Sequence, residues 1–267
     1  MGTLCIIRSL SISITLLVAF AILGGTAYGQ RRHKHSARTT AHAAKAASVD
    51  CSQYTEIGDC PLVGCGGEAA EQRLNERKNI SEIDLSTAVA TNFDTLRKKK
   101  VPAGYKYGVT PTRQLLTDGG EGSVVSTAAW LTAIRDGSKE TCNCKLSKAA
   151  DTDNHMVLIS DYVINHYAPE DWEKHSFTVE FAPRVKAKGH PNFRVNAIRP
   201  LIIADPRGRL RVRITGPLML DDYHVKHPLP NGRQTNWEIH PVFKFEYCPH
   251  PQQCSLASDA GWVNIDD

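Results

Sequence analysis

The stretch from residue 209 to residue 248 constrains the fold most, because it carries the most regular hydrophobic pattern in the chain. Residues 209–220 alternate apolar side chains with arginines, and a period of two is typical of a strand with one buried face and one solvated face. Residues 237–248 place aromatic side chains, Phe243 and Phe245 among them, at alternate positions, and this face needs a core to bury it. The stretch therefore predicts two strands that close a β-rich domain.

Other segments with strand character precede this stretch. Residues 124–134 are almost entirely apolar, which suits a strand buried on both faces. Residues 141–146 are expected to form the returning strand, and residues 155–159 begin a third strand. Residues 177–181 alternate and predict an extra strand inserted before the closing pair, and the apolar residues 193–204 are expected to be extended.

These strands lie at short intervals, which is typical of a small barrel or sandwich. Three strands, a short helical turn and two closing strands fit a five-stranded OB-type barrel best. The predicted fold class is mainly β, or α+β overall, with an OB-type small barrel and an N-terminal helical, disulfide-rich extension. The expected division is a signal peptide at residues 1–29, a disordered basic linker at 30–48, a cysteine-containing, partly helical extension at 49–122, the OB-like β domain at 123–250 and a C-terminal tail at 251–267.

Two helices are expected within the extension. Residues 68–79 have helix-favouring composition, although their apolar face is thin. Residues 84–100 place apolar side chains at helical spacing and end in a basic run, which suits the negative end of a helix dipole. Pro102 is expected to stop this second helix.

The first 29 residues have the composition of an export signal. Arg8 is their only charged residue, an apolar run follows at residues 10–23, and Ala27 and Gly29 supply small residues for cleavage before Gln30. Cleavage is expected to place the mature protein in the periplasm or outside the cell, with no membrane span. The alternative is an uncleaved membrane anchor, for which the apolar run is short.

The net charge of +4 is concentrated near the N-terminus. Residues 1–29 carry one arginine, and residues 30–48 carry five basic residues and no acid. Of the 32 Lys and Arg residues, 26 therefore remain against all 28 acids, which gives the rest of the chain a charge of about −2. Nucleic acid is not a favoured partner, because non-specific binding depends on neutralising phosphates.

Seven cysteines follow the expected signal segment: Cys51, Cys60, Cys65, Cys142, Cys144, Cys248 and Cys254. Export implies an oxidising compartment in which disulfides persist. The odd number leaves at least one cysteine outside an intramolecular pair. Cys248 and Cys254 could close a short loop, and the first three cysteines could hold the N-terminal segment, but the sequence leaves the pairing open.

A zinc site is the alternative use of these cysteines. It would combine Cys142 and Cys144 with Cys60 and Cys65. Paired zinc ligands usually have two or more residues between them, so the single residue between Cys142 and Cys144 fits poorly. Disulfides are therefore preferred.

Four segments carry a resemblance to an uncharacterised group of exported bacterial proteins. They are residues 141–144 (TCNC), 153–155 (DNH), 211–216 (RVRITG) and 237–242 (WEIHPV). The last segment is the most distinctive, and the resemblance covers roughly residues 123–248. It implies an OB-like barrel in the C-terminal region and no particular activity.

Acids and histidines gather near the ends of the expected strands. The candidate constellation is Asp153, His155, Asp221, Asp222, His224, Glu238 and His240. Glu238 and His240 lie two apart on one strand, so both project to the same face. If these groups converge at one barrel rim, carboxylates with imidazoles suit a divalent metal or general acid–base chemistry. The candidate roles are catalysis for Asp153, His155, Glu238 and His240, metal binding for His155, Glu238 and His240, and ligand binding for Asp222, His224 and Trp237.

Each of these residues also has a structural interpretation. His240 could satisfy a backbone group beside Pro241, Glu238 could pair with Arg211 or Arg213, and His155 could cap a turn with Asp153. The spacings HExxH and GxSxG and a glycine-rich phosphate loop are all absent from the sequence. The sequence therefore favours structural roles over catalytic ones.

Three functions are compatible with this sequence. The preferred one is a non-enzymatic, exported binding module whose barrel places an unidentified ligand across its strand face. The second is a metal-assisted hydrolase of phosphodiesters or similar bonds, in which the metal activates water and a carboxylate serves as base. The third is a structural protein of the cell envelope, tethered by its signal segment.

Overall fold

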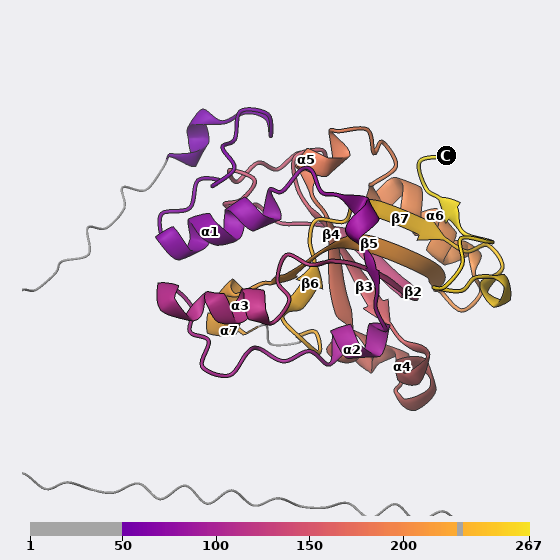
Figure 1. The fold of residues 1–267 in the computed structure, drawn as a ribbon. Helices are drawn as coiled ribbons and strands as arrows, with labels where there is room; N and C mark the ends of the chain where they lie inside the picture. Colours follow the sequence, from indigo (N-terminus) through magenta and orange to yellow (C-terminus); the bar gives the residue numbers. More distant parts are fainter. Residues whose placement is uncertain (1–49, 229–231) are drawn as a thin grey trace, which may run out of the picture. The chain divides into compact units, whose positions relative to one another are not determined.

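Strands that are far apart in the sequence pair side by side and close into a barrel. The computed structural model describes residues 50–228 and 232–267 (Figure 1). All of these fall within the unit Ala44–Asp267. The expected signal peptide at residues 1–29 and linker at residues 30–48 lie outside the described residues.

The strands are β1 (Val89–Ala90), β2 (Val124–Asp136), β3 (Asn154–Ile159), β4 (Phe177–Phe181), β5 (Leu210–Leu220), β6 (Trp237–Ile239), β7 (Lys244–Tyr247) and β8 (Val263–Asn264). The α-helices are α1 (Ala69–Lys78), α2 (Phe93–Arg97), α3 (Gln114–Asp118), α4 (Asp161–His166), α5 (Pro183–Lys186), α6 (Val195–Ala204) and α7 (Tyr223–Lys226). Short 3-10 helices are η1 (Cys51–Gln53), η2 (Leu85–Thr87), η3 (Thr110–Thr112), η4 (Pro169–His175) and η5 (Pro251–Gln253).

Five strands form the closed ring in the order β2-β3-β4-β6-β5. The pairings β2–β3, β3–β4, β6–β5 and β5–β2 are antiparallel, whereas β4–β6 is parallel. Strands β1, β7 and β8 extend the sheet beyond the ring. The prediction of a mainly β fold with a small barrel is confirmed, and the ring order, with α5 and α6 between β4 and β5, is consistent with an OB-type barrel.

The aromatic face of the closing segment lies in the core, as the alternation predicts. Phe245 is fully buried and Phe243 is 8% exposed. Phe93 and Leu116, from the N-terminal extension, belong to the same hydrophobic cluster. The extension therefore packs onto the barrel and shares its core, and α1, α3 and α7 lie on one side of the barrel in Figure 1.

The prediction of a returning strand at residues 141–146 is wrong. Cys144 and Lys145 have positive φ angles of 49° and 58°, so the chain turns here, and Cys144 is joined to Cys60. Cys142 and Cys144 have the two-residue spacing of one strand face. Two residues at this spacing also fit within a turn, so the spacing did not distinguish the two structures. The second barrel strand is therefore β3, and β4 is the third barrel strand rather than an insertion.

Three other local predictions are corrected. The apolar residues 193–204 form the helix α6, because Val195, Ile198 and Ile202 have helical spacing and face the core. Only the part Phe93–Arg97 of the second expected helix is α-helical. Residues 237–248 form two strands, because β6 pairs with β4 and β5 whereas β7 pairs with β5 and β8. The helix expected at residues 68–79 is confirmed as α1.

Six of the seven cysteines form disulfides. The pairs are Cys51–Cys65, Cys60–Cys144 and Cys248–Cys254, and Cys142 is free and buried. The expected loop closure at Cys248 and the role of the first three cysteines in holding the N-terminal segment are thereby confirmed. The alternative zinc site is wrong, because three of its four ligands are oxidised.

Within residues 50–228 and 232–267, no helix is long and apolar enough to cross a bilayer.

The disulfide pattern makes a direct prediction about thiol reactivity. Cys142 is 1% exposed, and burial raises the pKa of its thiol, so it should resist alkylation in the native protein. After unfolding without reductant, alkylation and peptide mapping should label Cys142 and leave the other six described cysteines as disulfide-linked peptides. Labelling of Cys144 or Cys60 under these conditions would contradict the pairing.

Candidate functional site

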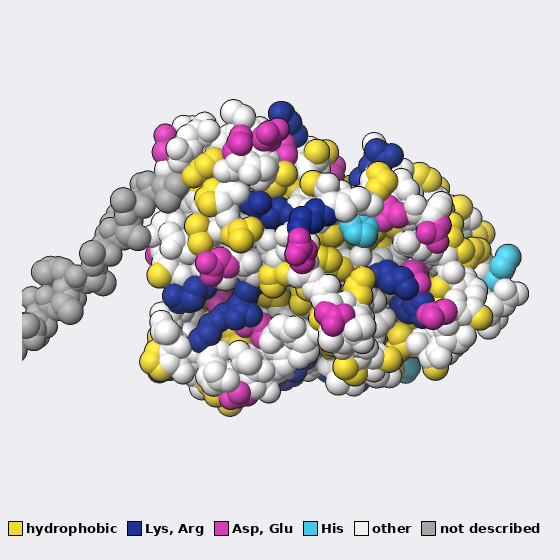
Figure 2. All heavy atoms as spheres, turned by 45° about the horizontal axis from the view of Figure 1, so that its top comes forward, with side chains coloured by type: hydrophobic (Ala, Val, Ile, Leu, Met, Phe, Trp, Pro, Cys, Tyr) yellow, Lys and Arg dark blue, Asp and Glu magenta, His cyan; other side chains and the backbone are white. Residues whose placement is uncertain are grey.

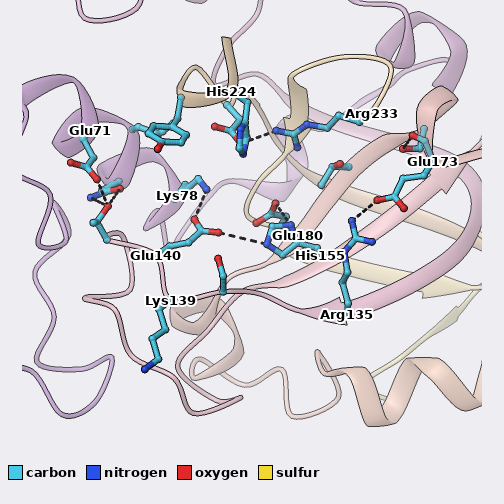
Figure 3. A pocket seen from close by; sticks show the side chains of 18 residues that line it. Glu71, Lys78, Arg135, Lys139, Glu140, His155, Glu173, Glu180, His224 and Arg233 are labelled. Carbon is cyan, nitrogen blue, oxygen red and sulfur yellow. Dashed lines mark hydrogen bonds and ion pairs between the residues drawn. The ribbon is translucent and has the colours of Figure 1, made fainter. Parts of the chain in front are cut away.

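A polar cavity of about 330 Å³ lies at one rim of the barrel, beside α1. Its walls come from α1, from the β2–β3 loop, from the β5–β6 loop that includes α7, and from strands β3 and β4 (Figure 3). It is lined by Glu71, Leu74, Asn75, Lys78, Arg135, Ser138, Lys139, Glu140, Thr141, His155, Glu173, Ser176, Thr178, Glu180, Asp221, Tyr223, His224 and Arg233. Segments that are distant in the sequence thus meet at one place.

His155 and Glu180 form the wall of this cavity. They are direct partners in the antiparallel β3–β4 register, so their side chains share one face. His155 Nδ1 lies 2.9 Å from Glu180 Oε1, and His155 Nε2 lies 3.6 Å from Glu140 Oε1 (Figure 3). Lys78 Nζ donates to Glu140 Oε2 at 2.8 Å. A buried carboxylate therefore orients an imidazole whose other nitrogen lies on the Glu140 side.

A second histidine lies behind Glu180. His240 directly follows β6, whose parallel pairing with β4 brings it beside Glu180. His240 Nδ1 lies 3.2 Å from Glu180 Oε2, and His240 Nε2 lies 3.7 Å from Asp153 Oδ1. Asp153, Glu180 and His240 are each 1% exposed. They form an inner group beneath the floor of the cavity, and Glu180 belongs to both layers.

Arg233 fixes the carboxylates on the other side of this group. Its Nη1 donates to Glu238 Oε2 at 2.5 Å, and its Nη2 donates to Asp221 Oδ2 at 2.7 Å. Glu238 Oε1 lies 3.4 Å from His240 Nδ1, and His224 Nε2 lies 3.5 Å from Asp221 Oδ2. The expected pairing of Glu238 with the arginines of β5 is therefore wrong.

Negative charge exceeds permanent positive charge in this cluster. Among the groups joined by direct ion-pair contacts, five carboxylates, those of Glu140, Asp153, Glu180, Asp221 and Glu238, surround the two permanent cations of Lys78 and Arg233, and Lys186 interacts with Asp153 from outside these contacts. Within these contacts, three negative charges therefore remain when His155, His224 and His240 are neutral. The buried excess must attract protons or metal cations, because an unpaired buried charge costs several kcal/mol, on the order of 3–5.

The histidines respond strongly to these carboxylates. The charge of Glu180 raises the pKa of His155 to about 11, against the effect of burial. Burial by itself would lower the pKa of His240, but Glu180 and Asp153 outweigh it and raise it to about 10. Burial raises the pKa of Asp153 to about 6. Without a metal ion, the imidazoles therefore carry part of the balancing charge as protons.

Several atoms of the inner group lack hydrogen-bond partners. Among the described residues, these are Glu180 Oε2, Glu238 Oε1 and both ring nitrogens of His240. The carboxylate atoms nevertheless lie close to His240 Nδ1, with Glu180 Oε2 at 3.2 Å and Glu238 Oε1 at 3.4 Å, so they interact as ion pairs. Buried polar atoms of this kind cost about 1–3 kcal/mol each and call for an explanation such as a bound ion.

Asp153, Glu180 and His240 have the arrangement of a metal-binding group. Each offers one ligand atom, and these atoms all lie within 4.8 Å of one another. A set of two carboxylates and one imidazole suits Zn²⁺ or Mn²⁺. The unpartnered atoms of Glu180 and His240 give such an ion available lone pairs.

The structure brings together most of the residues expected from the sequence. Asp153, His155, Glu238 and His240 converge around Glu180. Asp221 and His224 line the same cavity.

Two expected ligand-binding residues lie elsewhere. Trp237 is fully buried, and its indole nitrogen donates to the carbonyl of Lys100 at 3.0 Å. Asp222 is 3% exposed and is held by the Tyr105 hydroxyl and by Arg113. Both side chains are used inside the fold and neither lines this cavity, so their contact with a ligand stays a prediction.

Sequence reasoning missed four members of the cluster: Lys78, Glu140, Glu180 and Arg233. Glu180 alternates with Ser176 and Thr178, a pattern that indicated a solvated face, yet all three are buried. The signal available for Glu180 was that it is the one charged residue in the strand segment FTVEF, residues 177–181. Lys78 and Glu140 carry no signal, since only the fold brings α1 to the β2–β3 loop.

Comparison with known proteins yields no family model, no curated protein and no solved structure that matches this chain. Function must therefore be argued from the cluster itself.

Arg233 is expected to be essential for the stability of this rim. In Arg233→Met, Glu238 and Asp221 lose their shared cation, which should lower the free energy of unfolding by about 3–5 kcal/mol. Arg207→Met is the matched control, because Arg207 is 54% exposed and pairs with Asp205. That change should cost less than about 1 kcal/mol. Urea unfolding measures both, and equal losses would contradict the assigned role.

Proposed function

We propose that this protein is an exported hydrolase that depends on a divalent cation and acts on phosphodiesters or similar phosphoesters. The observation that carries the proposal is the group Asp153, Glu180 and His240, with its unpartnered ligand atoms, beside a polar cavity. The sequence left this function as the alternative to a binding module. The convergence of both histidines on Glu180 now favours it.

The residues divide into three roles in this proposal. Asp153, Glu180 and His240 hold the cation, which would polarise a phosphoryl oxygen or lower the pKa of a bound water. His155 transfers a proton through Nε2, because Glu180 fixes Nδ1 and thus the orientation of the ring. Lys78 and Arg233 line the cavity and offer positive charge to the phosphoryl oxygens.

The position of the cavity on the barrel supports the proposal. OB-type barrels take ligands on the face of their second and third strands, between the loops that follow the first and fourth strands. In this chain those strands are β3 and β4, and those loops are residues 137–153 and 221–236. His155, Glu180, Glu140 and Arg233 come from these four segments.

The lining of the cavity indicates the class of substrate. Leu74 is the one aliphatic side chain among the described residues that line it. A volume near 330 Å³ suits a small polar group. On the face shown in Figure 2, basic and acidic side chains alternate around a histidine, so no basic track crosses it. A small phosphodiester is therefore a better substrate than a long duplex, in agreement with the charge of about −2 for the chain beyond residue 48.

The covalent framework agrees with export. Three disulfides would not persist in a reducing cytoplasm, so an oxidising compartment is the natural location. The periplasm and the extracellular space both meet this requirement, and the expected signal segment provides the route.

Chelation distinguishes the proposed functions. The purified protein should contain a divalent metal by elemental analysis, and it should hydrolyse bis(p-nitrophenyl) phosphate. Removal of the metal with EDTA should lower the rate at least about 100-fold, because the cation supplies several kcal/mol of stabilisation. Zn²⁺ or Mn²⁺ should restore the rate. Bound metal without turnover of any phosphoester would support the binding module instead, and absence of metal would exclude the proposed site.

His155 can be tested against a closely matched histidine. The proton-transfer role predicts that His155→Gln lowers kcat by about 10²–10⁴-fold with the metal still bound. His190→Gln is the control, because His190 is also partly exposed and also pairs with a carboxylate, that of Asp266 at 2.8 Å. It should leave kcat unchanged. Equal effects of the two changes would show that His155 acts only through stability.

A further inference from the structure

The cysteine that remains outside the disulfides is placed against the candidate site. Cys142 is 1% exposed and follows Glu140 by two residues in the β2–β3 loop. Its Sγ lies 3.6 Å from Glu140 Oε2 and 3.8 Å from Asp153 Oδ2. Its neighbour Cys144 is used in the disulfide with Cys60. The one free thiol in the part of the chain that the structure describes thus faces two carboxylates.

The three side chains have the spacing of metal ligands. One ligand atom from each of Glu140, Cys142 and Asp153 lies within 4.8 Å of the others. Zinc bonds of about 2.3 Å to sulfur and about 2.0–2.2 Å to oxygen, at a tetrahedral angle, separate the two ligand atoms by roughly 3.5 Å. The observed separations of 3.6 and 3.8 Å are close to this value.

Asp153 connects this group to the inner group. Its Oδ2 accepts from Asn143 Nδ2 at 2.7 Å and also faces Cys142, whereas its Oδ1 lies 3.7 Å from His240 Nε2. His240 is 1% exposed, neither of its ring nitrogens has a hydrogen-bond partner among the described residues, and its Nε2 lies on the first-cation side of the Asp153 carboxylate. A carboxylate shared between two cation positions is the arrangement that a two-metal site requires, with the ions about 3.5–4 Å apart.

The charge balance of the cluster agrees with two cations. If Cys142 is a thiolate, it joins the five carboxylates as a sixth negative group, against the permanent cations Lys78 and Arg233. Two divalent ions supply the four charges that remain, and both histidines can then be neutral. A single divalent ion with a protonated thiol leaves one negative charge.

We propose that Cys142, as a thiolate, binds a second divalent cation together with Glu140 and Asp153, so that Asp153 bridges a binuclear centre. This inference rests on the proposed function, which supplies the first cation at Asp153, Glu180 and His240. When the sulfur–metal bond forms, the S–H bond breaks and its proton passes to solvent, with no change of oxidation state. The soft thiolate selects Zn²⁺ over Mg²⁺ at this second position.

Cobalt titration tests the second position separately from the first. The full-length protein, stripped of metal, should bind two equivalents of Co²⁺, and one of them should give a thiolate-to-cobalt charge-transfer absorption. Cys142→Ser should bind one equivalent without this absorption. The affinity for the lost ion should fall by on the order of 100-fold or more, since even outer-shell changes cost about 10–100-fold.

A measurement on the unaltered protein guards against a variant that fails to fold. X-ray absorption at the zinc edge of the fully loaded wild type should show a sulfur neighbour at about 2.3 Å. One bound equivalent and no sulfur neighbour would overturn the second position and leave the proposed function intact. If neither Co²⁺ nor Zn²⁺ binds, both proposals fail. An unchanged stoichiometry of two in Cys142→Ser would also overturn the role of the thiolate.

Discussion

The buried carboxylate of Glu180 is the constraint around which this rim of the barrel is arranged. A charge with 1% exposure cannot be kept there without partners, because removing it from water costs several kcal/mol. Glu180 obtains its partners from both sides of its own strand, since β3 supplies His155 and the end of β6 supplies His240. Both partners are titratable imidazoles. A bound cation can displace their protons and balance the charge of Glu180 in their place. The same partners that keep the charge buried are therefore the groups on which the proposed chemistry depends.

The topology explains why these partners meet. The antiparallel register of β3 and β4 places His155 opposite Glu180, and the parallel pairing of β4 with β6 brings His240 to the other carboxylate oxygen. Glu140 cannot be placed by strand pairing, because it lies in the β2–β3 loop. It is held by Lys78 of α1, and the Cys60–Cys144 disulfide fixes the same loop to the extension. The N-terminal extension thus contributes to the site as well as to the core.

The sequence predicted the features that depend on local periodicity. The alternation in residues 209–220 and 237–248 was enough to find the closing strands and the buried Phe245, and the two-residue spacing of Glu238 and His240 was enough to place both on one face. It was not enough to find Glu180, because alternation predicts one solvated face, whereas β4 is buried on both faces and β5 nearly so. The burial of Trp237 could not be read from its neighbours either, since an aromatic residue beside acids has the same local pattern in a core and in a ligand site. Arg233 and Lys78 depend on loop and helix packing, for which a single sequence carries no periodic signal.

The β2–β3 loop carries both the cysteines Cys142 and Cys144 and the site carboxylate of Glu140, so the oxidation states of these cysteines bear on the charges of the site. In an oxidising compartment, an accessible thiol is exposed to oxidants and to exchange with neighbouring disulfides, yet Cys142 lies two residues from Cys144 and is reduced. Burial by itself protects it from solvent. The two carboxylates against its sulfur also disfavour the thiolate that exchange requires, for as long as no cation lies between them. A cation bound at that position, as proposed, would reverse this preference and occupy the sulfur at the same time. Cys142 would then be protected in both states, as an inert thiol without metal and as a bound ligand with it, which gives a physical reason for an odd cysteine beside the acids of the site.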